Sequence, residues 1–167
     1  TERVWFQTSV SVTTNGSDMV FWSDSDSSGS GAQYYEGSNV FTSNGGNLVM
    51  GGGPDDGGTA NPEIIGHVSG DGEPDGYAAG ISGWGQNAGV DILGSHQLLT
   101  AGGNISIAGR GSVTAGDDDY GVSDRGGLIY SGSGTISFFG KSPASCAANW
   151  HRGVVFSWGA TSNIISN

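Results

Sequence analysis

Three acidic, glycine-rich stretches hold the residues best suited to chemistry. They are "SDSDSSGSG" with Asp24 and Asp26, "GDGEPDG" with Asp71, Glu73 and Asp75, and "AGDDDYG" with Asp117, Asp118 and Asp119. Alternating carboxylates followed by a flexible glycine match the start of a calcium-binding loop, although the first stretch lacks a closing glutamate. The alternative is a set of solvated turns, because Asp and Gly are favoured there. The candidate calcium ligands are therefore Asp24, Asp26, Asp71, Asp75, Asp117 and Asp119, and no cofactor is required.

The same residues give little support for catalysis. Asp117 to Asp119 is the one run that invites polysaccharide cleavage. Adjacent residues of a strand point to opposite faces, so the run does not place two carboxylates across a glycosidic bond. The three histidines, His67, His96 and His151, lack the spacing of metal ligands and are interpreted as surface or turn residues. We predict that the chain is not an enzyme.

Composition limits the classes of partner. A length of 167 residues fits a single domain, residues 1–167. The net charge of −11 argues against nucleic acid, since an acidic chain repels phosphates. No apolar run reaches the length of about 18 residues that a membrane-spanning helix needs, so no membrane insertion is expected. The one cysteine, Cys146, excludes an internal disulfide.

A repeat organises the rest of the chain. Four copies share an apolar triplet with internal offsets of seven and two: Val12, Met19 and Phe21; Phe41, Leu48 and Met50; Leu98, Ile105 and Ile107; Ile129, Ile136 and Phe138. A polar turn, usually with glycine, separates the first two positions of each triplet. The offset of two is the period of a β-strand, which predicts that Ile105 and Ile107 point inward and Ser106 outward.

The repeat length is about 30 residues. Gly-Val recurs at Gly89, Gly121 and Gly153, at intervals of 32 residues (121 − 89 and 153 − 121). The triplets start 29, 57 and 31 residues apart (41 − 12, 98 − 41, 129 − 98). Because 57 is close to two units, a degenerate fifth copy is expected within Asn61 to Ala88.

These observations predict an all-β solenoid. Each unit holds about three short strands joined by turns, and no helical pattern of about ten residues or more appears. Stacked three-strand units with a constant inward face form a parallel β-helix, here of about five coils. A propeller needs blades of about 40 residues or more, and a sandwich explains short strands but not the fixed offsets.

The phrases "GGNISIAGRG", "GVSDRGGLIYSGSGTISFFGKS" and "VFTSNGGNLVMGGG" resemble the repeat region of filamentous haemagglutinin-like exoproteins and related bacterial surface adhesins. The similarity lies in the Gly-Val starts, the "GGN" turns and the Ile-x-Ile strands. It covers most of the chain, and is best from Gly89 onward. The resemblance implies a right-handed parallel β-helix, an extracellular or cell-surface location of bacterial type, and an adhesive or scaffolding role.

The expected function follows from the rod and its ends. The sequence is strand-like at both ends, without a capping pattern, which favours part of a longer rod or end-to-end self-association into filaments. We therefore expect an extracellular structural or adhesive element of a filament or surface stalk. Its expected contacts are further copies, surface glycans or other cells. The alternative is a calcium-stabilised carbohydrate-binding module.

Overall fold

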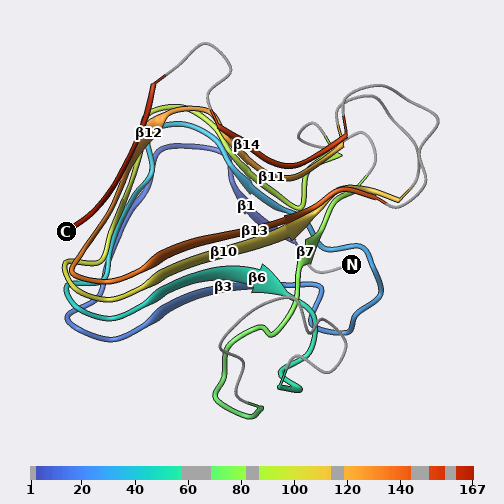
Figure 1. The fold of residues 1–167 in the computed structure, drawn as a ribbon, viewed down its shortest axis with the longest axis horizontal. Helices are drawn as coiled ribbons and strands as arrows, with labels where there is room; N and C mark the ends of the chain where they lie inside the picture. The colour runs from blue at the N-terminus through green and yellow to red at the C-terminus, as the bar shows by residue number, and fades with distance from the viewer. Residues whose placement is uncertain (1–2, 58–68, 82–86, 114–118, 144–150, 157–160) are drawn as a thin grey trace.

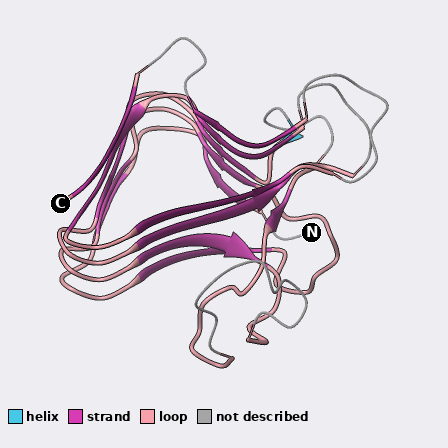
Figure 2. Cartoon of the chain, viewed as in Figure 1, coloured by secondary structure: helices cyan, strands magenta, loops and turns pink. Residues whose placement is uncertain are grey.

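The chain folds into a parallel β-solenoid. The computed structural model describes residues 3–57, 69–81, 87–113, 119–143, 151–156 and 161–167. Within them, three parallel sheets enclose a core (Figure 1). No α-helix is present among the described residues, and the short cyan piece in Figure 2 is a 3-10 turn at Asn87. The predicted all-β parallel β-helix is confirmed.

Each sheet collects one strand from every coil. Sheet A contains β1 (Val4–Phe6), β4 (Gln33–Tyr35), β8 (Val90–Ile92), β11 (Tyr120–Asp124) and β14 (Arg152–Phe156). Sheet B contains β2 (Ser11–Thr13), β5 (Val40–Thr42), β9 (His96–Leu99), β12 (Gly127–Gly132) and β15 (Ser162–Ser166). Sheet C contains β3 (Met19–Ser23), β6 (Leu48–Gly52), β10 (Ile105–Arg110) and β13 (Ile136–Lys141), with the short β7 (Ala78–Ala79) beside β10. The chain therefore makes four complete coils and the first two strands of a fifth.

The register of the sheets matches the predicted triplets. Val12 pairs with Phe41, and Leu98 pairs with Ile129 in sheet B. In sheet C the rows run Met19, Leu48, Ile105, Ile136 and Phe21, Met50, Ile107, Phe138. The Gly-Val marker is also in register, since Val122 pairs with both Val90 and Val154. The offset of seven thus spans the polar turn from sheet B to sheet C, and the offset of two separates two inward residues of the same sheet C strand.

The inward rows form one continuous core. Its fully buried members include Phe41, Leu98, Ile105 and Ile129. In the first two coils, four rings from three sheets pack together: Phe6, Phe21, Tyr35 and Phe41. Most of these ring pairs meet edge-on or tilted, and Phe6 stacks on Tyr35, which are the arrangements that aromatic rings prefer. Phe21 and Phe41 of the predicted apolar triplets therefore face the core.

The turns between sheets B and C explain the glycine-rich signature. A β-carbon on Gly103 would overlap the carbonyl oxygen of Gly46, and one on Gly134 would overlap that of Gly103. The preceding glycine, Gly102, has a positive φ of +127°, which L-residues rarely adopt. The glycine pair therefore has two separate causes, a close approach between coils and a left-handed backbone.

The expected degenerate copy within Asn61 to Ala88 is wrong. Leu48 of β6 pairs directly with Ile105 of β10, so no coil lies between them. The interval of 57 residues is one coil plus an insertion that leaves sheet C after Gly52 and rejoins sheet A before Val90. Its length is close to one repeat, which made it indistinguishable from a weak copy by spacing alone.

The described part of the insertion joins sheet C and also covers part of its outer face. Ala78 and Ala79 of β7 pair with the end of β10, where the pairing of β6 with β10 has stopped, and Ala78 belongs to the main core. Tyr77 packs against Ala108 and Phe139 on that face. Trp22 Nε1 donates a hydrogen bond of 2.7 Å to the Gly53 carbonyl, which holds the start of the insertion to β3. In Figure 1 this green segment lies beyond the end of β6. The insertion therefore makes the outer face of an otherwise regular sheet uneven.

Candidate functional site

A ladder of polar side chains runs up the turn before sheet C. The backbone N–H of Asn47 donates to Asp18 Oδ1 (2.6 Å), that of Asn104 to Asn47 Oδ1 (3.0 Å), and that of Thr135 to Asn104 Oδ1 (2.9 Å). Each of these residues immediately precedes the first inward residue of its sheet C strand. The ladder continues the parallel hydrogen bonding through the turn, and it uses only the oxygen of each asparagine.

A groove of about 500 Å³ lies beside this ladder on the outer face of sheet C. Residues of all four complete coils and of the insertion line it: Asp18, Asn47, Leu48, Val49, Asp71, Glu73, Asn104, Ile105, Ser106, Thr135, Ser137 and Phe139. Asp71 and Glu73 come from the insertion, and Ser106 and Ser137 from outward strand positions. The groove therefore depends on both the regular coils and the insertion.

The groove is acidic and polar. Its charged lining residues, Asp18, Asp71 and Glu73, are all carboxylates. The pKa of Glu73 is raised, first by burial and then by Asp71, Asp18 and Asp75. The remaining lining is mainly amide and hydroxyl groups, with one aromatic ring, Phe139. Such a surface favours ligands rich in hydroxyl groups and repels anions.

The second acidic stretch braces the insertion. Asp55 accepts hydrogen bonds from the N–H groups of Gly70 and Gly72. Asp71 Oδ1 accepts from the Glu73 N–H (3.0 Å), and Asp75 Oδ2 accepts from the Gly57 N–H (2.6 Å). Asp71 and Asp75, two of the candidate calcium ligands, therefore bind backbone donors.

The first acidic stretch is used in a similar way. The buried carboxylate of Asp24 accepts from Ser28 Oγ and from the N–H groups of Gly29 and Ser30, and lies 3.8 Å from Arg110 Nη2. Asp26 accepts from the Ser28 N–H. The hydrogen bonds to these carboxylate oxygens stabilise the loop. They fit the alternative in which this stretch is a turn.

The third stretch lies mostly outside the described residues. Asp117 is among those not described, whereas Asp119 is buried, with Oδ2 3.4 Å from His151 Nδ1. In the described part of the chain, no group of three or more His, Cys, Asp or Glu residues is arranged to hold a metal ion. Calcium binding stays a prediction.

The interpretation of His96 as a surface or turn residue is wrong. His96 is 1% exposed, and its Nε2 lies 3.3 Å from Oδ1 of the equally buried Asp124. His96 is two residues before Leu98 on the same strand, so both side chains point inward. Burial lowers the pKa of His96, while Asp124 acts in the opposite direction. The strand period was the signal that would have placed both residues inside.

Another buried carboxylate, Asp91, lies on the outer face of sheet A. Asp91 is 1% exposed, pairs in register with Tyr34 and Ser123, and has Oδ2 3.6 Å from Arg125 Nη2. Burial raises the pKa of Asp91 to about 7 against the opposing effects of Arg125 and Ser123. The pKa of Tyr34 is raised to about 12, first by burial and then by Asp91.

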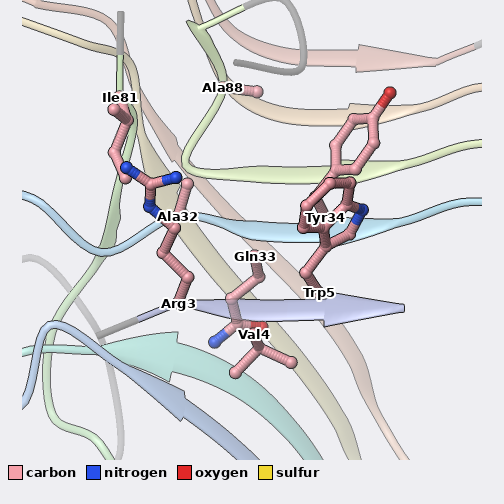
Figure 3. A pocket seen from close by; sticks show the side chains of 8 residues that line it. All are labelled: Arg3, Val4, Trp5, Ala32, Gln33, Tyr34, Ile81 and Ala88. Atoms are coloured by element: carbon pink, nitrogen blue, oxygen red, sulfur yellow. The ribbon is translucent and has the colours of Figure 1, made fainter. Parts of the chain in front are cut away.

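Beside Tyr34, Trp5 and Ala88 help to enclose a pocket of about 10 Å³ (Figure 3). That volume holds about one water molecule. The pocket is therefore too small for an organic ligand, and the groove on sheet C is the better candidate site.

Asp91→Asn is expected to raise the free energy of unfolding at pH 8 by about 2 kcal/mol. The folded pKa of about 7 exceeds the unfolded value, so the contribution of Asp91 is fully present below about pH 4 and is lost as the pH rises through 7. The full shift corresponds to about 4 kcal/mol, of which losing the attraction of Arg125 cancels part.

Urea denaturation at intervals from pH 4 to pH 9 measures this effect. The parent should become less stable as the pH rises from 4 to 8. The Asp91→Asn variant should not show this decline, while the exposed control Asp26→Asn should keep it. A pH profile of Asp91→Asn that parallels the parent would contradict the assignment of this decline to Asp91.

The end faces of the stack form a second surface of interest. Within the described residues, no strand pairs with the outer edges of β1, β2 and β3 or of β13, β14 and β15. Phe156, Ile164 and Ile165 are 42%, 40% and 43% exposed. Phe156 and Ile164 end inward rows that begin with Phe6 and Val12, so both faces present core-type side chains.

Comparison with known proteins found no match. No family model, no curated protein and no solved structure matches the chain. Among the described residues, no helix is long and apolar enough to cross a membrane.

Proposed function

We propose that the chain is a structural and adhesive element of an extracellular β-solenoid filament or surface stalk, of the filamentous haemagglutinin-like kind. The observation that carries this proposal is the pair of end faces with apolar rows, at whose strand edges no described strand is paired. A parallel coil placed on either face extends the hydrogen-bonded ladders and buries the exposed apolar rows. The partner we propose is a further copy of the chain.

Stacking of identical copies gives an open filament. The face formed by β13, β14 and β15 differs from the face formed by β1, β2 and β3, so the contact is head-to-tail. A head-to-tail contact that does not close on itself repeats without limit. The sheets are parallel throughout, so the added copy keeps the direction of the strands.

The polar groove favours a second candidate, the carbohydrate-binding module. Its carboxylate, amide and hydroxyl lining suits sugar hydroxyl groups. The two candidates are compatible, because the groove lies on a lateral face and leaves both end faces free.

Ile164→Lys is expected to abolish filament growth, because it places a charge in an apolar contact. Electron microscopy and light scattering over a range of concentrations should show filaments of mixed length for the parent and single particles for the variant. Val113→Lys is the matched control, since Val113 is 63% exposed but lies outside the terminal strands.

The variant also tests the direction of growth. Ile164→Lys retains an intact face at β1, β2 and β3, so small amounts of it should join parent filaments and stop their extension. Circular dichroism confirms that the variant is folded. Monodisperse single particles of the parent at every concentration would rule out assembly by copies.

A further inference from the structure

We propose that the groove on sheet C binds a linear, uncharged glycan that lies across the coils, parallel to the solenoid axis. This inference deepens the adhesive part of the proposed function and names its ligand class. The groove has a volume of about 500 Å³ and receives lining residues from four successive coils.

The spacing of the lining residues fits a polymer. Successive coils of a parallel solenoid are about 4.8 Å apart, which is the distance between neighbouring strands. The ladder therefore offers one polar side chain per coil at this interval from Asp18 to Thr135, with the same carboxamide at Asn47 and Asn104. One hexose unit of an extended β-linked glycan has nearly the same length, so each consecutive sugar meets a polar side chain of the ladder.

The hydrogen-bonding groups fit sugar hydroxyls. The ladder occupies Oδ1 of Asn47 and Asn104, which leaves their carboxamide N–H groups as donors at the groove. Ser106 and Ser137 add hydroxyl groups from outward positions of neighbouring strands in register. Asp71 and Glu73 add acceptors from the insertion, and a carboxylate can accept from two adjacent hydroxyl groups.

The charge of the groove selects among glycans. Among the described residues, its charged lining consists of the carboxylates Asp18, Asp71 and Glu73, without a lysine or arginine. Sulfated or uronic acid polymers are therefore repelled. Phe139 provides one aromatic ring at the groove, and an aromatic face packs on the apolar face of a pyranose.

Isothermal titration calorimetry on the full chain tests the proposal with three probes: cellohexaose and chitohexaose as neutral glycans, and a heparin hexasaccharide as an acidic one. At least one neutral probe should bind, and the heparin probe should not. Ser106→Tyr fills the groove and should weaken binding by at least about tenfold. The control Thr13→Tyr, on an exposed position of sheet B, should change it by less than about twofold.

The carboxylates are tested separately. Glu73→Gln with Asp71→Asn should weaken neutral glycan binding by about fivefold, since each loses a charged hydrogen-bond acceptor. Failure of both neutral probes, binding that Ser106→Tyr leaves intact, or tighter binding of the heparin probe than of the neutral probes would overturn the proposal.

The result is independent of filament assembly. The Ile164→Lys variant keeps the groove and should bind the neutral probe as the parent does. Glycan binding without filaments would contradict the proposed structural role and support this site. Filaments without glycan binding would support the structural role and contradict this site.

Discussion

Asp124→Ala is expected to lower the free energy of unfolding by about 3–5 kcal/mol, the usual loss when one partner of a buried polar pair is removed. Asp124 and His96 are both about 1% exposed or less and lie among apolar side chains of two sheets. The truncation leaves the His96 ring without its carboxylate neighbour and opens a space in the core. Urea denaturation at pH 7.5 measures the loss. The exposed control Asp26→Ala should change stability by about 0.5 kcal/mol or less.

A paired replacement separates the two causes. The double variant His96→Leu with Asp124→Leu should recover most of the lost stability, because apolar residues of similar size replace both polar groups. If Asp124→Ala alone costs less than about 1 kcal/mol, the pair is not a buried interaction of this kind.

The same pair predicts sensitivity to acid. The pKa of His96 is lowered in the folded chain, so below about pH 6.5 the unfolded chain takes up the proton first and stability falls. The double variant should lose this contribution. Asp91 has the opposite effect in the same range, so Asp91→Asn should expose the decline caused by His96.

Gly103→Ala is expected to cost about 3 kcal/mol, because the new β-carbon overlaps the Gly46 carbonyl of the coil below. A flexible side chain can move away, but a backbone carbonyl in a parallel ladder cannot move without shifting its coil. Hydrogen exchange should show the loss of protection in the second to fourth coils, since each coil is stabilised by its neighbours.

The control is Gly70→Ala. Gly70 has a φ of +81° and open space around it, so its substitution measures the backbone effect alone, about 1 kcal/mol. Gly103 does not have a positive φ, so its substitution measures the overlap alone. Equal losses at the two positions would contradict a steric origin of the glycine column.

The regular part of the coil could be predicted from the sequence because one physical rule repeats in it. Met19, Leu48 and Ile105 are apolar for the same reason, and their offsets survive between copies. The inward polar residues escaped prediction because Asp124 stands in an otherwise aromatic and aliphatic row of sheet A, while His96 pairs with Gly127 and belongs to no apolar triplet. Their two-residue spacing from Leu98 and Val122 still marked the face that they share.

The groove was beyond sequence reasoning for a different reason. The asparagines of the "GGN" turns were visible, but Asp71 and Glu73 reach the same surface only through the insertion. An insertion has no period, so its path depends on tertiary contacts such as those of Tyr77 and Trp22. The acidic stretches were likewise visible as sequence, while their binding to backbone N–H groups depended on loop geometry.

The insertion between the second and third coils also affects how the charge of the groove on sheet C can vary. β6 pairs with β10 at three residues, and β7 of the insertion takes its place beside Gly109 and Arg110, so the insertion is part of the stack as well as of its surface. The insertion supplies two of the three carboxylates at the groove, Asp71 and Glu73, and the coils supply the other lining residues. Variation at Asp71 and Glu73 alone would change the charge of the groove without altering the pairing of β7 with β10.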